Sequence, residues 1–150
     1  MRIVVQRVSR ASVDVGGTRI GEIGRGLLLL VGIAPEDASL DLHRIASKIV
    51  TLRIHEDDDG KMNRSLVEVD GGVLAVSQFT LLADTRKGRR PSFVGAAAPE
   101  IAEPTFEALV DAIRDQGVEV QTGRFGAKMA VESVNDGPVT LTLEVEPDTG

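Results

Sequence analysis

The sequence predicts an α/β fold, a curled, mixed but largely antiparallel β-sheet or barrel-like core with two helices on its outside. Many short segments are apolar throughout or alternate apolar with polar residues, which is typical of strands. Two segments instead repeat apolar residues at three- and four-residue steps, which indicates amphipathic helices. Glycine and proline fall singly between these segments and no repeat is present, so we expect one domain over residues 1–150.

The first elements are predicted to be antiparallel strands. Residues 3–8 and 12–15 have strand character, and the two glycines at 16 and 17 form the turn that a hairpin prefers. Residues 18–23 then return as its second strand. Residues 27–33 are apolar throughout, which predicts a central strand covered on both faces.

Two helices are expected to pack on this sheet. The first covers residues 35–52, where apolar positions form a one-sided stripe. The second has Pro104 near its first turn, where proline is tolerated, and ends at Gly117.

The other segments are predicted strands. Residues 73–82 form a second buried strand, because they are apolar on both faces apart from a few polar side chains. Residues 118–121, 127–134 and 139–146 close the chain as strands, and a turn at residues 135–138 separates the last two.

Composition excludes several classes of protein. The chain has no cysteine, so disulfides, thiolate metal sites and cysteine nucleophiles are all excluded. A net charge of −6 and only four aromatic residues, all phenylalanine, argue against a general nucleic-acid binder. The longest apolar run is far short of the roughly 20 residues of a membrane helix. No signal-peptide pattern follows Met1, so we expect a cytoplasmic protein without membrane contact.

Familiar catalytic and cofactor motifs are missing. The glycines of residues 21–26 are in the wrong order for a dinucleotide fingerprint, and the acidic turn at 57–60 does not align with a calcium loop. His43 and His55 have no ligand at metal-binding spacing, and both are expected on the surface. We therefore expect no cofactor, no metal and no serine-histidine triad.

Polar side chains interrupt the predicted strand 73–82. Because side chains alternate along a strand, Gln78 and Thr80 would share one face while Ser77 and Phe79 share the other. The four would reach one pocket only if the strand bent there. The alternative is that they are ordinary hydrogen-bonded residues of the core.

The turn at residues 135–138 has an unusual order, because Gly137 precedes Pro138. Proline cannot donate a hydrogen bond to a sheet at the start of a strand. The segment is either a plain tight turn or one that presents bare backbone carbonyl groups, since glycine has no side chain to cover them.

Four cations lie within five residues, at Arg86, Lys87, Arg89 and Arg90. Without them the chain would hold 13 of its 17 basic residues against 23 acidic ones, so this positive charge is local. Such a segment suits the docking of one polyanion, although charge runs are also found in solvated loops.

Together these motifs resemble the D-aminoacyl-tRNA deacylases, also called D-tyrosyl-tRNA deacylases. The resemblance runs from Met1 to about Glu146 and rests on five segments in order. They are Gln6-Arg7-Val8 with Ala11-Ser12-Val13, Ser77-Gln78-Phe79-Thr80-Leu81, Lys87-Gly88 with Arg90-Pro91-Ser92-Phe93, Gly123 with Phe125-Gly126-Ala127 and Met129, and Asn135 with Gly137-Pro138 and Thr140.

The resemblance implies a homodimer that hydrolyses the ester between a D-amino acid and the 3′ end of tRNA, a chiral proofreading step in translation. In this family the Gly-Pro peptide is cis, and each subunit inserts it into the other's site. The implied catalytic pocket consists of Ser77, Gln78, Phe79 and Thr80. The implied substrate-binding residues are Gly137, Pro138, Met129 near the terminal adenosine, Arg7 steadying the Gly-Pro segment, Asn135 and Phe125. The implied tRNA-binding residues are Arg86, Lys87, Arg89 and Arg90.

The mechanism is expected to depend on the backbone. No histidine, lysine or carboxylate is placed by the sequence to deprotonate Thr80, and an unassisted hydroxyl is a poor nucleophile. We expect attack by water, with backbone N–H groups near Phe79 and Thr80 stabilising the oxyanion and the substrate's 2′-hydroxyl helping proton transfer. A site that excludes L-side chains would also cleave glycyl-tRNA. The alternatives are a noncatalytic RNA- or ligand-binding dimer and a general small-ester hydrolase.

Overall fold

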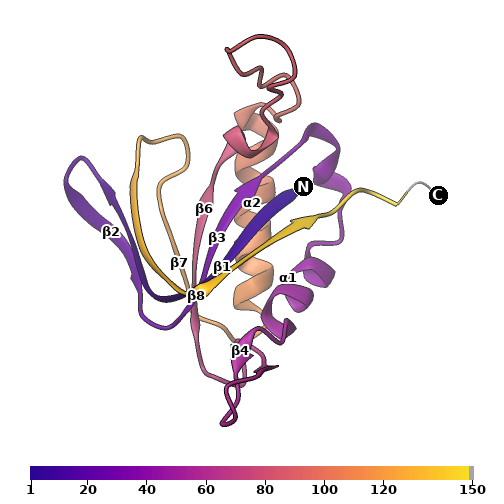
Figure 1. Ribbon diagram of the computed structural model, residues 1–150. Coiled ribbons are helices and arrows are strands. Elements are labelled where there is room, and N and C mark those ends of the chain that lie inside the picture. Colours follow the sequence, from indigo (N-terminus) through magenta and orange to yellow (C-terminus); the bar gives the residue numbers. More distant parts are fainter. Residues whose placement is uncertain (149–150) are drawn as a thin grey trace.

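Strand β1 organises the sheet in the computed structural model, which describes residues 1–148 (Figure 1). β1 (Arg2–Val15) pairs on one side with β8 (Ala130–Glu144) and on the other with β2 (Thr18–Ile23) and β3 (Gly26–Gly32). All three pairings are antiparallel. The two glycines at 16 and 17 have positive φ and connect β1 to β2, as the sequence predicts.

Beyond β3 the sheet becomes parallel. β3 pairs with β6 (Gly72–Ser77), and β6 pairs with β7 (Val120–Thr122), so the strand order is β2-β1-β3-β6-β7. The two ends of this order, β2 and β7, also lie side by side. Their backbones approach so closely that a Cβ on Gly21 would lie 2.7 Å from the carbonyl oxygen of Thr122. The sheet is thus curled and nearly closed into a barrel, which confirms the predicted fold class.

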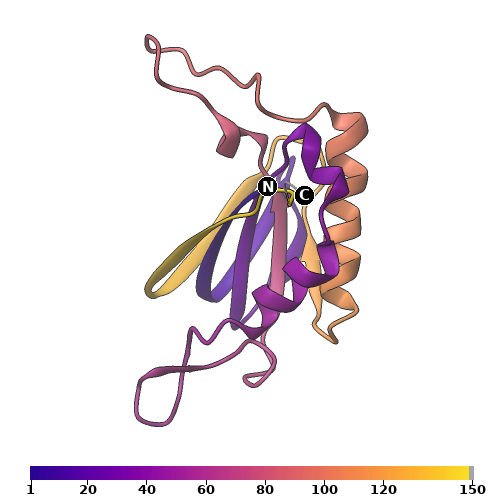
Figure 2. The ribbon, with the colours of Figure 1, turned by 90° about the vertical axis from the view of Figure 1, so that its right-hand side faces the viewer.

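Both helices cover one face of the sheet (Figure 2). α1 (Leu42–Thr51) and α2 (Pro99–Arg114) pack on a core that includes the fully buried Ile3, Leu29 and Ile49. Burial of this kind contributes about 25 cal/mol per Å² of apolar surface. A second, smaller core on the opposite face contains Val13, Leu28 and Leu74 with their neighbours.

The helix boundaries differ from those predicted. Residues 35–39 form a separate 3₁₀ turn, and α1 begins after Asp41, whose carboxylate accepts a hydrogen bond from the backbone N–H of Arg44. α2 begins five residues before Pro104, because Pro99 starts it with a favourable φ. Pro104 therefore lies inside the helix. It has no backbone N–H to donate to the carbonyl oxygen of Glu100, which is exposed in the first turn.

Two predicted strand boundaries are wrong, and both concern the motifs. β6 ends at Ser77 and is followed by a 3₁₀ turn, η2 (Phe79–Leu82), so residues 73–82 are not one strand. Residues 130–144 are one strand rather than two strands around a turn, because both halves pair with β1. A small hairpin of β4 (His55–Glu56) and β5 (Met62–Arg64) is an addition to the prediction.

Candidate functional site

The first part of the candidate site is the abrupt turn at the carboxyl end of β6. Ser77 is the last strand residue and pairs with Val31 of β3. The backbone N–H of Gln78 donates to the carbonyl oxygen of Val31 at 2.8 Å, after which the chain turns into η2. The four motif residues, 77–80, could share one pocket only if the strand bent there. The chain does turn at this place.

Two residues distant in sequence make this turn possible. A Cβ on Gly32 would lie 3.0 Å from the Cβ of Leu81, so η2 packs closely on the end of β3 because Gly32 has no side chain. The Arg2 Nη1 donates to the Leu81 carbonyl oxygen at 2.7 Å. Arg2 is therefore a supporting residue that sequence reasoning missed, since no local pattern connects it with residue 81.

The turn brings polar groups together at its outer side. The side-chain Nε2 of Gln78 donates to the hydroxyl Oγ1 of Thr80 at 3.0 Å. In the described residues, the backbone N–H groups of Phe79 and Thr80 have no hydrogen-bond acceptor, and both residues are exposed. Two free N–H donors next to each other can bind one carbonyl or oxyanion oxygen.

The Thr80 hydroxyl has no base beside it in the described part of the chain. Its recorded partner is the Gln78 amide, which donates a hydrogen bond and cannot take up a proton. The local chemistry therefore favours polarising a substrate over activating the threonine.

A long loop beside this turn carries the predicted basic cluster. Phe79 contacts Phe93 edge to face, with ring centroids 5.1 Å apart, and backbone hydrogen bonds of 2.7 and 2.9 Å pair Asp84 with Ser92. These contacts fix the ends of the loop, which projects to the side opposite the helices (Figure 2). The base of the loop is therefore fixed beside the Ser77–Thr80 turn, and the basic residues lie in the part that projects beyond it.

The four cations of this loop are not equivalent. The Arg86 guanidinium binds both carboxylate oxygens of Asp84, at 2.9 and 2.7 Å, and lowers the pKa of that carboxyl. Lys87, Arg89 and Arg90 are exposed and have no ion-pair partner among residues 1–148. These three are the cations available to an external anion.

The second part of the candidate site is a bulge in β8. Thr140 pairs with Gln6 and Asn135 pairs with Val8, so four residues, 136–139, lie opposite Arg7 alone. The bulge contains the Gly137–Pro138 peptide, which is cis, and both residues are exposed. The predicted turn is thus a bulge, because the strand continues along β1 on both sides of it.

Glycine is required at position 137. Its φ is +143°, and a Cβ there would lie 2.8 Å from the backbone nitrogen of Val139. A larger residue would strain the backbone and displace the bulge.

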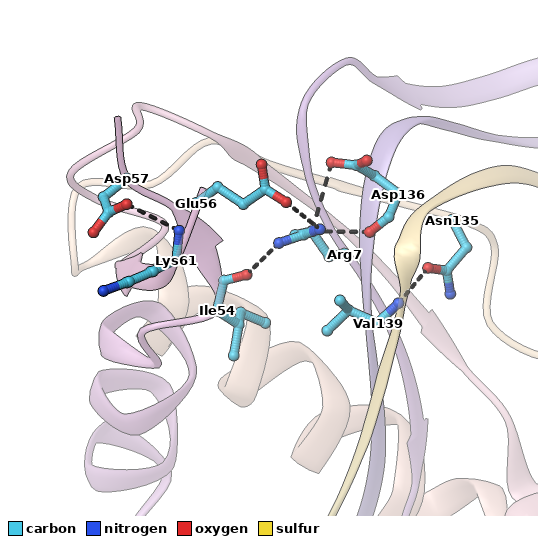
Figure 3. A network of polar contacts seen from close by, with 8 residues as sticks. All are labelled: Arg7, Ile54, Glu56, Asp57, Lys61, Asn135, Asp136 and Val139. Carbon is cyan, nitrogen blue, oxygen red and sulfur yellow. Dashed lines mark hydrogen bonds and ion pairs between the residues drawn. The ribbon is translucent and has the colours of Figure 1, made fainter. Parts of the chain in front are cut away.

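A buried arginine holds the N-terminal end of the bulge (Figure 3). Arg7 is only 4% exposed, and its Nε donates to the Asp136 carbonyl oxygen at 2.9 Å. Its Nη1 donates to the carbonyl oxygen of Ile54 at 2.8 Å, and Nη2 lies 3.6 Å from a carboxylate oxygen of Glu56. Ile54 directly precedes β4 and Glu56 belongs to it, so the unpredicted β4–β5 hairpin orients the arginine.

Asn135 uses both ends of its amide inside the bulge. Its Oδ1 accepts from the backbone N–H of Val139 at 2.8 Å, and its Nδ2 donates to the Thr140 hydroxyl at 3.0 Å. Both contacts are internal to the bulge. A direct role of Asn135 in binding substrate stays a prediction.

One chain does not bring the two parts of the site together. Ser77 is level with Ile3 of β1 through Val31, whereas Arg7 lies four residues further along that strand. The two parts are therefore about 13 Å apart along the strands and about 14 Å, or three strand spacings, apart across the sheet.

Two further predicted residues lie on opposite faces of the sheet. Met129 is half-buried against the small core that includes Val13. Phe125 packs on the helix side, in a cleft of about 440 Å³ that α2 lines. A cleft of about 820 Å³ lies between α1 and the C-terminal segment, away from both parts of the site.

The prediction for His55 is wrong. His43 is exposed as expected, but His55 is 1% exposed, and neither of its ring nitrogens has a hydrogen-bond partner among the residues that the structure describes. Burial, helped by the nearby charges of Arg25 and Arg7, lowers the pKa of His55 to about 4. The residue was misplaced because the β4–β5 hairpin folds back toward the sheet, which local polarity does not reveal.

Within residues 1–148, no group of three or more histidine, aspartate or glutamate side chains is arranged to hold a metal ion. No helix in this range is long and apolar enough to cross a membrane.

Comparison with known proteins identifies the family. A profile described as D-Tyr-tRNA(Tyr) deacylase matches residues 4–144. Proteins named D-aminoacyl-tRNA deacylase include one from Desulfatibacillum aliphaticivorans, 58% identical over 144 residues, with 96% of this chain and 99% of that protein covered. One from Thermus aquaticus is 53% identical over 150 residues, with 100% and 99% covered.

Two solved structures share the fold of this chain. The c-Myc DNA Unwinding Element Binding Protein superposes with a TM-score of 0.90 at 42% identity, covering 98% of this chain and 100% of that chain. A structure described as "Structural Analysis of a probable eukaryotic D-amino acid tRNA deacylase" superposes with a TM-score of 0.81 at 18% identity, covering 96% and 98%, and so shares the fold. From the profile and the relatives, this chain belongs to the D-Tyr-tRNA(Tyr) deacylase family.

Proposed function

We propose that this protein, as one domain of residues 1–150, hydrolyses the ester bond of D-aminoacyl-tRNA and releases the D-amino acid and tRNA in the cytoplasm. The observation that carries the proposal is the turn after β6, where, within residues 1–148, the N–H groups of Phe79 and Thr80 are free and the neighbouring hydroxyl has no base. Such a site can polarise an ester but offers no triad chemistry.

The reaction is then a direct attack by water. The ester carbonyl oxygen accepts hydrogen bonds from the N–H groups of Phe79 and Thr80, which stabilise the negative charge that develops on it. A water oxygen bonds to the carbonyl carbon and the bond to the ribose 3′-oxygen breaks. The water proton passes to the 3′-oxygen with help from the neighbouring 2′-hydroxyl of the substrate. Ser77 and Gln78 line the pocket, and Gln78 orients Thr80.

A second copy of the chain completes the site in this proposal. The Gly137–Pro138 bulge is exposed, is held in place from behind by Arg7, and lies far from the Ser77–Thr80 turn of its own chain. An exposed and preset bulge is suited to enter the site of a partner subunit. A homodimer would thus carry two sites, each containing residues of both subunits.

Selection against L-amino acids would come from this bulge. If a carbonyl oxygen of Gly137 or Pro138 binds the substrate's amino group and the N–H groups of Phe79 and Thr80 bind its ester, the α-carbon is fixed. An L-side chain would then point into backbone atoms, a repulsive contact. Glycine has no side chain to meet that wall, so glycyl-tRNA is also a substrate.

The tRNA would be held by the basic loop and the β7–β8 segment. Lys87, Arg89 and Arg90 are free to bind phosphates, whereas Arg86 contributes less because Asp84 already neutralises it. Met129 is assigned to the terminal adenosine. Phe125 belongs to the same segment and packs on the helix side, and we assign it to the substrate-binding residues.

The test compares D-alanyl-, L-alanyl- and glycyl-tRNA side by side, with and without EDTA. We expect cleavage of the D-alanyl and glycyl esters, sparing of the L-alanyl ester, and no effect of the chelator. Equal cleavage of the D and L esters would indicate a general ester hydrolase. Binding without any cleavage would indicate a noncatalytic nucleic-acid-binding protein, and resistance of glycyl-tRNA would show that the D-side chain is positively recognised.

A further inference from the structure

The C-terminal end of the Gly137–Pro138 bulge is fastened by contacts that do not involve Arg7. The Asn135 Oδ1 accepts from the backbone N–H of Val139 at 2.8 Å, so this side chain spans the bulge from its first flank to its last residue (Figure 3). The Asn135 Nδ2 donates to the Thr140 hydroxyl at 3.0 Å. The Gln6 Nε2 of β1 donates to the same hydroxyl at 3.3 Å.

These contacts replace the missing strand pairing. Because four residues lie opposite Arg7, residues 136–139 have no partner in the β1 ladder within the described chain. Arg7 holds the Asp136 carbonyl, which fixes one end. With that anchor alone, the backbone from 137 to 139 could still rotate. The bond from Val139 to Asn135 fixes the other end and leaves Gly137 and Pro138 as the segment in between.

The Thr140 hydroxyl links this clamp to the sheet. It accepts hydrogen bonds from the Asn135 amide on its own strand and from the Gln6 amide on β1. The hydroxyl thus connects the Asn135 side chain to β1. Both the oxygen and the nitrogen of the Asn135 amide bind groups of the bulge itself, so the orientation of this side chain is set by the clamp.

We propose that Asn135 and Thr140 are positioning residues for stereoselection, which set the direction of the Gly137 and Pro138 backbone carbonyls without touching the substrate. The proposal rests on the proposed function, in which this backbone forms the wall that rejects L-side chains. A loosened wall accepts an L-side chain more readily and holds the amino group of the D-substrate less well. Loosening the bulge should leave tRNA binding unchanged, because the basic loop follows η2 and is not part of β8.

The experiment compares Thr140→Val with Thr140→Ser. Valine has the shape of threonine but no hydroxyl, whereas serine keeps the hydroxyl and should restore the clamp. Thr142→Val is the matched control, because Thr142 is exposed on the same face of β8 and makes no side-chain hydrogen bond in the described residues. Asn135→Ala breaks the same clamp from its other end and serves as the second variant.

The readout is the ratio of kcat/KM for D-alanyl-tRNA to that for L-alanyl-tRNA, with KM recorded separately. For Thr140→Val and Asn135→Ala we expect this ratio to fall by about fivefold or more, because each variant removes two hydrogen bonds of the clamp. KM for tRNA and the melting temperature should stay near the wild-type values, and Thr140→Ser and Thr142→Val should keep the wild-type ratio.

The outcomes separate the two proposals. If the wild-type protein does not cleave D-alanyl-tRNA, the proposed function fails. If it does, and both clamp variants are folded, elute at the wild-type size and keep the wild-type D-to-L ratio, the positioning role is overturned. A loss of D- and L-cleavage in equal proportion also overturns it, because a merely structural defect would lower both.

Discussion

The two parts of the site are built in opposite ways. The Ser77–Thr80 turn is exposed and ends in N–H groups that no residue of the described chain binds, whereas the Gly137–Pro138 bulge is tied at both ends. The turn thus leaves donors free for a substrate, and the bulge uses its contacts to hold a shape. In the proposed dimer, each site would combine the free donors of one chain with the preset wall of the other.

The largest effect is expected from removing one donor of the turn. Thr80→Pro removes an N–H that has no acceptor in the described residues, and proline suits the φ of a helical turn. Loss of an oxyanion donor costs about 10²- to 10³-fold in kcat. Single-turnover deacylation of D-alanyl-tRNA measures it.

Thr80→Ala is the matched comparison for that variant, because it keeps the N–H and removes the hydroxyl. We expect it to retain much of the activity. Complete loss in a folded Thr80→Ala protein that still binds tRNA would return the nucleophile role to threonine.

The next effect tests the preset shape of the bulge. Gly137→Ala places a Cβ 2.8 Å from the nitrogen of Val139 at a φ of +143°, so the bulge must move. Because residue 137 is exposed, stability should change by no more than about 1–3 kcal/mol of local strain. Deacylation should fall by roughly tenfold or more, following the same 1–3 kcal/mol. A wild-type rate in this variant would mean that the bulge takes no part in the site.

A smaller effect is expected in the basic loop. Lys87→Gln, Arg89→Gln or Arg90→Gln should each flatten the dependence of log affinity for tRNA on log salt concentration by somewhat less than one unit. Arg86→Gln should change this slope less, because Asp84 already binds Arg86. Equal slopes for all four variants would contradict the distinction between paired and free cations. Filter binding over a salt series measures them.

The smallest effect at neutral pH, and a clear one in acid, is the effect of His55 on the stability of the fold. His55 has a pKa of about 4 in the folded protein, against 6.5 for an unperturbed histidine, so the unfolded state binds more protons between these values. Stability is therefore complete above about pH 6.5 and decreases as the pH falls to 4, by up to about 3 kcal/mol. His55→Phe should remove this loss.

Urea unfolding from pH 7 to pH 4 measures the effect, and His43→Gln is the control because His43 is exposed. A wild-type and a His55→Phe protein with parallel pH profiles would show that His55 is hydrated or paired in solution.

Much of the fold was predictable because its signals are local. Continuous apolar runs and one-sided stripes mark the central strands and both helices, and the two-glycine turn marks the first hairpin. These patterns follow from backbone geometry and burial, which act over a few residues. The motifs at Ser77–Thr80 and Gly137–Pro138 were also visible in the sequence, as polar or glycine-proline interruptions of apolar segments.

What the sequence left open was the shape of both motifs. The turn after Ser77 depends on Gly32 and Arg2, and the bulge at Gly137 depends on β1 pairing with both halves of β8. These partners lie about 45 to more than 130 positions away along the chain, so no local pattern contains them. The same is true of buried His55. The sequence by itself indicated the two motifs to which we assign the chemistry; the tertiary structure decided how they are held, because hydrogen bonds and close packing between distant strands set the backbone there.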